Sequence, residues 1–225
     1  MIFLGIFLLF LSPKRRANLL QIDQIMLETL RKYVSGYVGL TDEEFALMGE
    51  KIIIRQFDRR ECLLRVGETE RYMNFVVQGL VRMYFPRGKT EVITNIAKEG
   101  ELVSSSASFL SATPSHYFIE TLEPTTLLSL TREHLDEIYQ KSVRIERLGR
   151  LLTTQFVMQK EQWEHECMRL DTRERFMRFT EGNPHLMTRV PQKYLASYLN
   201  MKPETFSRLK NLTKKRASGT KSFSK

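Results

Sequence analysis

The stretch Val190–Leu212, VPQKYLASYLNMKPETFSRLKNL, decides how the rest of the chain is interpreted. Its apolar residues Leu195 and Leu199 recur at helical spacing, and residues 200–202 interrupt that pattern. Pro203 suits the first position of a new helix, because its missing N–H would have no partner there in any residue. The stretch therefore predicts a helix, a turn and a second helix. An ordinary helical hairpin of an all-α domain fits the same pattern, so the remaining sequence has to separate the two interpretations.

The second helix would turn an apolar side inward and a polar side outward. Phe206 and Leu209 fall on the inner side. The outer side carries side chains of the types that read base edges or hold phosphates, among them Asn211. The candidate DNA-binding residues are Glu204, Thr205, Ser207 and Arg208 on the helix, Lys202 at its start, and Lys193, Lys210, Lys214 and Lys215 as phosphate partners.

The charge of the chain indicates a polyanionic partner. The 225 residues carry a formal net charge of +9, and the sequence pI is near 9.6. Such an excess fits nucleic acid or an anionic membrane surface, although a basic protein need have neither partner. Much of the excess lies in residues 169–225, on both sides of the predicted helix-turn-helix. That placement favours double-stranded DNA over a membrane.

Cysteine and histidine usage indicates neither a metal site nor a cofactor. Cys62 and Cys167 lie far apart in the sequence, which argues against a disulfide framework and fits a reducing, cytoplasmic setting. The four histidines show no H-x-x-x-H spacing. No pairing of a nucleophile with a base is legible either, so we expect no catalytic residues and no enzyme activity.

Residues 2–11, IFLGIFLLFL, are almost continuously apolar and are followed by the basic cluster Lys14–Arg16. The tract is shorter than the about 20 residues of a membrane-spanning helix, and it lacks the features of a secretory signal. A short membrane anchor, an element docked on the protein body, and upstream sequence translated from a misplaced start codon remain open. We favour the misplaced start, because Met26 opens a helix-like segment.

Between Ile52 and Leu130 the hydrophobic period changes to two, which is typical of strands. Short apolar segments separated by turn residues such as Gly67 and Gly79 predict an antiparallel barrel or jelly roll, not a parallel sheet. Two helical segments, 27–38 and 42–51, precede the strands and a short one, 131–139, follows them. The predicted strands are 52–57, 62–66, 72–78, 80–85, 92–97, 117–121 and 125–130.

A long helix is predicted from a capping residue, Ser142, to about Arg169. Its apolar residues keep close to a three-four repeat, which is typical of a seam between two paired helices. A core helix lying across its own β domain has a similar pattern, and different faces of one helix can serve both roles. The predicted dimer seam consists of Ile145, Leu148, Leu152, Phe156 and Trp163.

The order of β roll, long helix and helix-turn-helix resembles the Crp/Fnr family of bacterial transcription regulators, typified by the cyclic-AMP receptor protein. The resemblance runs from about Met26 to Thr213 and is carried by LLRVGETERYMNFVVQGLVRMYF, EGELVSSSASFL, PSHYFIETLEPTTLLSL and VPQKYLASYLNMKPETFSRLK. The run Pro203–Arg208 is similar to the recognition helix of the Bacteroidetes branch. The implied fold class is α+β, with an N-terminal antiparallel β-roll of the cyclic-nucleotide-binding type, a long dimerisation helix and a C-terminal winged helix-turn-helix.

The resemblance implies a homodimer whose recognition helices enter successive major grooves of a palindromic operator, with RNA polymerase as a further partner. Glu204 and Arg208 align with base-contacting positions of the family, and their chemistry suits cytosine N4 and guanine O6 and N7. Pro203 stands where the cyclic-AMP receptor protein has another base-reading arginine, so the operator should differ. Lys202, at the expected N-cap, suits a phosphate better than it suits capping.

The ligand half of the family pattern is altered in this sequence. Members that bind a cyclic nucleotide place Gly-Glu ahead of Arg-Ser or Arg-Thr, whereas the aligned positions here are Ser104-Ser105 and Ser115-His116. Without an arginine the phosphate would lack a charge-matched partner, so we expect no cyclic-AMP binding. Ser104, Ser105, Ser106, Ser115 and His116 either line a pocket for an unknown small-molecule effector or occupy ordinary loop and strand-end positions.

Two other functions compete with DNA binding. A ligand-sensing regulatory module would need an intact nucleotide pocket and no helix-turn-helix, and a membrane-surface protein would use residues 2–16. The sequence favours neither, and we expect no membrane partner. The predicted division is an N-terminal extension (1–25), an effector-like β-roll (26–141), a dimerisation helix (142–169), a DNA-binding domain (170–213) and a basic tail (214–225).

Overall fold

The computed structural model describes residues 13–219, with side chains described from residue 24 to residue 213. The apolar tract at residues 2–11 and the interpretations attached to it lie outside the described residues. Two helices, α2 (Pro13–Ser35) and α3 (Asp42–Gly49), precede the strands, as the sequence predicts. Because α2 begins at Pro13, the boundary expected before Met26 falls within one helix.

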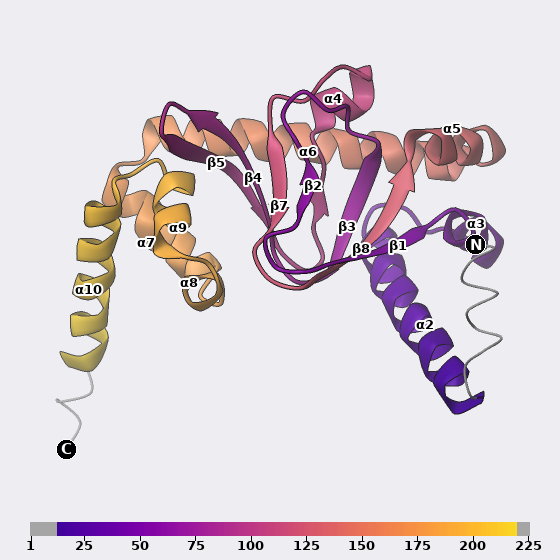
Figure 1. Cartoon of the computed structure of the whole chain (residues 1–225), viewed down its shortest axis with the longest axis horizontal. Helices are drawn as coiled ribbons and strands as arrows, with labels where there is room; N and C mark the ends of the chain where they lie inside the picture. Colours follow the sequence, from indigo (N-terminus) through magenta and orange to yellow (C-terminus); the bar gives the residue numbers. More distant parts are fainter. Residues whose placement is uncertain (1–12, 220–225) are drawn as a thin grey trace.

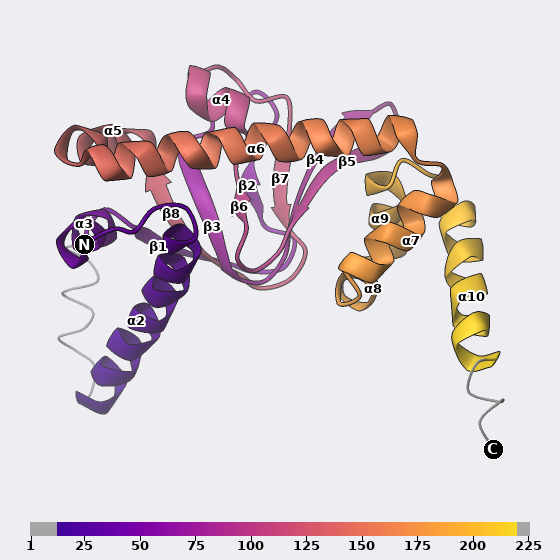
Figure 2. The ribbon, with the colours of Figure 1, turned by 180° about the vertical axis from the view of Figure 1, so that it is seen from behind.

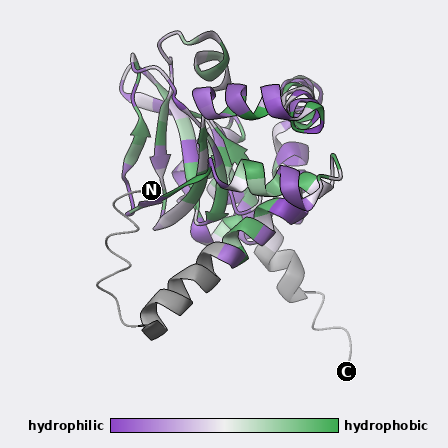
Figure 3. Cartoon of the chain, turned by 90° about the vertical axis from the view of Figure 1, so that its right-hand side faces the viewer, coloured by the Kyte–Doolittle hydropathy of each residue, from purple (hydrophilic) through white to green (hydrophobic). Residues whose placement is uncertain are grey.

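Antiparallel strands pack as two facing sheets, which confirms an α+β fold with an antiparallel roll. The strands are β1 (Ile53–Phe57), β2 (Cys62–Leu64), β3 (Tyr72–Gln78), β4 (Val81–Arg87), β5 (Thr90–Ala97), β6 (Leu102–Val103), β7 (Phe118–Thr121) and β8 (Thr125–Thr131). One sheet has the order β1-β8-β3-β6 and the other β2-β7-β4-β5. Figure 3 shows both hydrophobic and hydrophilic residues on the strands of the roll. The core between the sheets includes Val76, Val81, Ile119 and Leu127, each 0% exposed.

The turn between β3 and β4 requires a glycine. Gly79 has a φ of +99°, and a Cβ there would lie 2.5 Å from Thr125 Oγ1 and 2.6 Å from the carbonyl oxygen of Pro124. Any other residue would therefore meet both a strained backbone and the neighbouring turn. The glycine that the sequence places at this turn is fixed by conformation and by space.

The long helix α6 (Val143–Arg169) follows the short helix α5 (Arg132–Lys141) and runs along one side of the roll (Figures 1 and 2). Ser142 caps it as predicted, since its Oγ accepts the N–H of Ile145 at 3.2 Å. Ile145 and Leu148 are each 2% exposed and pack in one cluster with Phe75 and Leu128 of the roll.

The rest of the predicted seam also faces its own chain. Leu152 packs against the same cluster as Ile145, Phe156 is half-buried, and Trp163 stacks on Tyr198 with ring centroids 4.6 Å apart. The second interpretation of the helix, in which it lies across its own β domain, therefore holds for this face. A partner helix would have to use a different face.

Four helices complete the described chain: α7 (Thr172–Gly182), α8 (Leu186–Arg189), α9 (Gln192–Tyr198) and α10 (Pro203–Gly219). The pair α9 and α10 is the helix, turn and helix predicted from residues 190–212. The expected wing is not seen, since no strand follows Thr131 within residues 132–219. Pro184 and Pro191 bracket the single-turn helix α8, and residues 203–219 stay helical, so neither segment supplies a β-hairpin.

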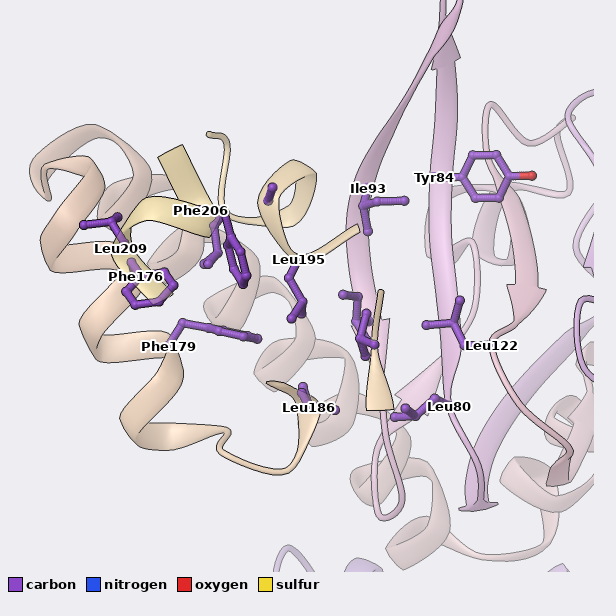
Figure 4. Close-up of a cluster of buried hydrophobic side chains, with 14 residues drawn as sticks. Leu80, Tyr84, Ile93, Leu122, Phe176, Phe179, Leu186, Leu195, Phe206 and Leu209 are labelled. Atoms are coloured by element: carbon purple, nitrogen blue, oxygen red, sulfur yellow. The ribbon is translucent and has the colours of Figure 1, made fainter. Parts of the chain in front are cut away.

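The helix-turn-helix domain is docked on the roll and shares a core with it. One buried cluster contains Leu80, Ile93 and Leu122 from the roll together with Leu195 and Phe206 from the C-terminal helices. Figure 4 shows Leu195 of α9 between Ile93 of β5 and the pair Phe176 and Phe206, which lie farther from the roll. The sequence predicts two domains joined by a long helix, and it does not predict this shared core.

Candidate nucleic-acid interface

An aromatic core supports the helix-turn-helix. Phe176 of α7 and Phe206 of α10 are both 0% exposed, and their rings meet edge to face with centroids 5.2 Å apart. Asp171 starts α7 with a capping box, in which its side chain accepts the N–H of Glu174 and the Glu174 side chain accepts the N–H of Asp171. Because Phe206 points inward, the opposite side of α10 faces solvent.

The turn between α9 and α10 is fixed by an asparagine and a buried arginine. Asn200 has a φ of +51°, a conformation that asparagine tolerates better than most residues. Arg175, only 8% exposed, donates Nε to the carbonyl of Leu199 at 3.2 Å and Nη1 to the carbonyl of Leu170 at 2.5 Å. The ends of α9 and α6 are thereby tied to α7, and the start of α10 is held in place.

The solvent side of α10 carries an open hollow of about 690 Å³. From Glu204 to Asn211 the helix rises about 10.5 Å, close to three base-pair steps of about 3.4 Å. A surface of this length, rich in charged and polar groups on one helix, can follow the base edges of a major groove. The hollow is lined by Pro203, Glu204, Ser207, Arg208, Asn211 and Leu212.

Three of the predicted DNA-binding residues, Glu204, Ser207 and Arg208, come together in this hollow and are exposed. Lys202 is exposed just before it, and its carbonyl accepts the N–H of Phe206 at 3.1 Å, so it stands at the predicted start of the helix. The other predicted residues lie outside the hollow.

These others differ in how open they are to a partner. Thr205 and Lys210 lie on α10 and are half-buried. Lys193 on α9 is exposed, and its Nζ lies 4.9 Å from the ring centre of Tyr194. The side chains of Lys214 and Lys215 lie outside the described residues. Among the predicted DNA-binding residues whose side chains are described, those of the hollow, Lys202 and Lys193 are therefore the most accessible to a partner.

Asn211 and Leu212 also line the hollow. Helical spacing predicted Asn211 on the outer side of the helix, although it was not counted among the DNA contacts. It lies seven residues after Glu204 and three after Arg208, a spacing that places all three on one side. Leu212 was not predicted, and it is 53% exposed despite being apolar. An asparagine can bond bidentately to adenine, and an apolar side chain suits the thymine methyl group.

The expected effector residues lie around a short helix, α4 (Ser106–Ser111), that the sequence did not predict. Ser105 and Ser115, 3% and 2% exposed, are hydrogen-bonded to each other, with Ser115 Oγ donating to Ser105 Oγ at 2.8 Å. Ser104 is buried with no hydrogen-bond partner for its Oγ within the described residues, whereas His116 is exposed. We call residues 104–116 the cassette.

A buried carboxylate, Glu70, faces the cassette. It is 6% exposed, accepts the N–H of Tyr72 at 3.0 Å and, more weakly, the N–H of Ser105 at 3.4 Å. Its own N–H donates to Ser108 Oγ in α4 at 2.9 Å. Burial raises the pKa of Glu70, although its hydrogen bonds and the nearby Arg55 counteract that shift. The backbone of the cassette thus already meets an acidic group of this chain.

Two other kinds of site are absent from the described part of the chain, residues 13–219. Among the side chains described there, those of residues 24–213, no group of His, Cys, Asp and Glu could hold a metal ion. None of the helices in that range combines the length and the apolar character that crossing a bilayer requires. Neither finding extends to the residues outside that range.

Comparison with known proteins matches the roll to a family. Residues 54–142 match the family model described as the cyclic nucleotide-binding domain. No curated protein matches the sequence. Among solved structures, FixK2 from Bradyrhizobium japonicum is 20% identical with a TM-score of 0.62, over 75% of this chain and 86% of that one.

Two further structures show the same arrangement. A regulator of the crp/fnr family from Eubacterium rectale is 14% identical with a TM-score of 0.60, over 79% of this chain and 85% of that one. The c-di-GMP responsive regulator CLP from Xanthomonas campestris is 17% identical with a TM-score of 0.57, over 80% and 93%. Residues 54–142 therefore match a cyclic nucleotide-binding domain, and the described chain shares the fold of these solved regulators.

Proposed function

We propose that this protein is a sequence-specific DNA-binding transcription regulator that acts as a homodimer. The observation that carries the proposal is the exposed face of α10, where Glu204, Ser207, Arg208 and Asn211 share one hollow on a helix whose other side is packed. These groups are chemically matched to base edges, and the net charge of +9 suits the phosphate backbone. The fold of the solved regulators supports the same assignment.

The homodimer would use the side of α6 that faces away from the roll. This side carries large apolar residues that are unusually exposed, including Val143 at 78%, Met158 at 58% and Met168 at 86%. At 100° per residue Val143 and Met168 lie roughly opposite Ile145 and Leu148, which the roll occupies, and Met158 lies about 80° from Leu148, at one edge of that side. Thr154 lies on the same side and Leu151 beside Met158 at its edge, so a second copy of α6 would cover a stripe that includes Leu151, Thr154 and Met158.

The dimer can be tested without DNA. Met158→Glu places a charge in the middle of the stripe and should shift the sedimentation coefficient from that of a dimer to that of a monomer. Gln159→Glu, one residue away and also exposed, is the matched control and should leave the dimer intact. If the wild type sediments as a monomer at micromolar concentration, or if both variants behave alike, this seam is wrong.

We also propose that the roll does not bind cyclic AMP. Ser105 and Ser115 stand at the positions where the nucleotide-binding pattern has charged residues, and their hydroxyls are already bonded to each other. The Glu70 carboxylate accepts the Ser105 N–H and would repel a phosphate placed there. Calorimetric titration with cyclic AMP and cyclic GMP should show no heat of binding, and tight one-to-one binding would refute this part of the proposal.

The decisive experiment for DNA binding is selection of bound sequences from a random pool by the purified protein. We expect a palindromic site whose half-sites reflect Arg208 and Glu204, and a DNA affinity that falls linearly with salt concentration on logarithmic axes. If no sequence is enriched, the alternative function, a ligand-sensing regulatory module without DNA binding, would replace this one. The resemblance also implies RNA polymerase as a further partner, membership of the Bacteroidetes branch and a cytoplasmic location. These inferences would be withdrawn together with the proposed function.

A further inference from the structure

We propose that Arg189 is a positioning residue that fixes the DNA-reading helix relative to the β-roll and thereby sets the spacing between the two half-sites of the operator. The inference rests on the proposed DNA-binding function, and it adds a requirement that the function alone does not contain. A helix-turn-helix domain could be attached to the roll only through α6 and move independently of it. Here the domain is docked on strands β4 and β5 and on the loops at the end of the roll.

We call the contacts between the roll and the helix-turn-helix domain the clamp, and its first part is apolar. Leu80 and Ile93 of the roll are 0% and 3% exposed, and they share a buried cluster with Leu195 and Leu199 of α9, both 0% exposed. Figure 4 shows Leu80, Ile93 and Leu195 of this cluster where the roll meets the C-terminal helices. Domains joined by small polar contacts move by default, whereas a shared apolar core holds them in one arrangement. Apolar contact is not directional, however, so polar contacts have to select the orientation.

Arg189 makes the most extensive of these polar contacts. Its Nη1 and Nη2 donate to the two carboxylate oxygens of Glu99 at 3.0 and 2.6 Å, and Nη2 also pairs with Glu123. Glu99 is itself held by the N–H of Gly79, which lies 2.9 Å from Oε1. A bidentate arginine–carboxylate pair is specific in direction as well as in charge. The end of α8 is thereby aligned with two separate turns of the roll.

Two other contacts tie α9 to the roll in the same register. Ser197 Oγ accepts the N–H of Ile93 and donates to the carbonyl of Glu91, both at 3.0 Å, so α9 bonds to the backbone of β5. Arg82, 3% exposed, lies between the rings of Tyr84 of the roll and Tyr194 of α9, at 4.0 and 4.2 Å from their centres. These contacts resist separation, whereas Arg189 sits just before α9 and resists rotation.

Orientation matters because a dimer has to place two reading helices on one rigid duplex. Half-sites of such dimers lie about one helical turn apart, so the angle of each reader against its roll determines which spacing fits. A reader that is intact but free to rotate would still bind one half-site. It would lose the gain in affinity that comes from binding two half-sites at once.

The test compares a full palindromic operator with a single half-site, both taken from the selected sequences. Arg189→Glu should lower the affinity for the full site at least about tenfold and change that for the half-site by less than about twofold. The selected spacing should also become broader. Arg189→Gln, which removes the charge without adding repulsion, should show the same pattern more weakly and guards against a variant that fails to fold.

Arg173→Glu is the matched control. Arg173 is exposed on α7 in the same domain, so the substitution makes the same change in net charge away from the clamp. It should leave the ratio of full-site to half-site affinity unchanged. If Arg189→Glu lowers both affinities equally, Arg189 either contacts a phosphate or is needed for folding. If the substitution raises both affinities, the clamp inhibits DNA binding. Either result overturns the inference while leaving DNA binding by the wild type, and thus the proposed function, intact.

Discussion

The cassette and the exposed face of α10 that lines the hollow, which we call the reading face, differ in whether their polar groups already have partners. In the cassette, Ser105 and Ser115 are buried and bond to each other, and Glu70 accepts the Ser105 N–H. On the reading face, Glu204 and Arg208 are exposed and converge on an open hollow. Both regions belong to domains that bind charged ligands in other proteins, yet only one of them offers its polar groups to a partner.

This difference indicates which of the two regions has polar groups available to a partner. A buried hydroxyl or carboxylate that already has a partner gains little from a ligand, because the ligand must first replace that partner. An exposed arginine or glutamate on a helix keeps its full bonding capacity, while the packed helix fixes the position of its backbone. On the proposed function, α10 would therefore contact DNA, and the roll would hold α10 in place.

The largest expected effect comes from a substitution in the buried core that supports the reading face. Phe206→Ala should destabilise the protein by about 3–5 kcal/mol, because it deletes a 0% exposed ring that packs on Phe176. Thermal unfolding followed by circular dichroism measures the loss, and DNA binding should disappear under conditions where the wild type binds. Leu212→Ala, on the exposed side of the same helix, should change stability by less than about 0.5 kcal/mol.

The next largest effect should come from the face itself. Arg208→Ala should cost about 1–3 kcal/mol of operator affinity, about 5- to 150-fold, and should relax the preference at one base pair. Lys193→Ala should weaken binding to all sequences alike and reduce the salt slope by about one. Competition assays with operators mutated at each position separate the two outcomes. Uniform losses in both variants would show that the division between base reading and phosphate binding is mistaken.

The sequence predicted local structure well and long-range packing poorly. The strand Tyr72–Gln78 was predicted with its observed bounds, and Ser142 marks the start of α6 as predicted, because periodicity and capping are local properties. The two-residue strand β6 and the helix α4 were missed because they are too short to show a period. The face of α6 that meets the roll has the same spacing as a dimer seam, so only the structure could separate them.

The candidate site divides in the same way. Helical spacing placed Glu204, Ser207, Arg208 and Asn211 on the outer side of the second helix, and all four line the hollow. The contact of Glu70 with Ser105 joins residues 35 positions apart, and that of Arg189 with Glu99 joins residues 90 apart. No local pattern marks either pair. Charge and spacing in one element are readable from a sequence, whereas partners on distant elements are not.

A smaller effect should appear at the clamp under acidic conditions. Although partial burial alone would raise it, the hydrogen bonds from Arg189 and Gly79 lower the pKa of Glu99 to about 2 from an ordinary value of 4.5. Stability from this depressed pKa is present above pH 4.5 and is lost as the pH falls from 4.5 to about 2. The midpoint of thermal unfolding of the wild type should therefore approach that of Glu99→Gln across this window, and Glu50→Gln serves as the exposed control.

The cassette should respond to pH with the opposite sign. Burial raises the pKa of Glu70 above its ordinary value of 4.5, so the folded protein binds a proton there more readily than the unfolded chain does. Stability linked to this group is fully present below pH 4.5 and is lost as the pH rises through the raised pKa. Acidification from neutral pH toward 4.5 should therefore stabilise the wild type relative to Glu70→Gln, whereas Glu68→Gln, two residues away and exposed, should show no such trend. A wild type that instead loses stability relative to Glu70→Gln over this range would mean that the carboxylate is held ionised by Arg55, and the cassette would then present a fixed negative charge at neutral pH.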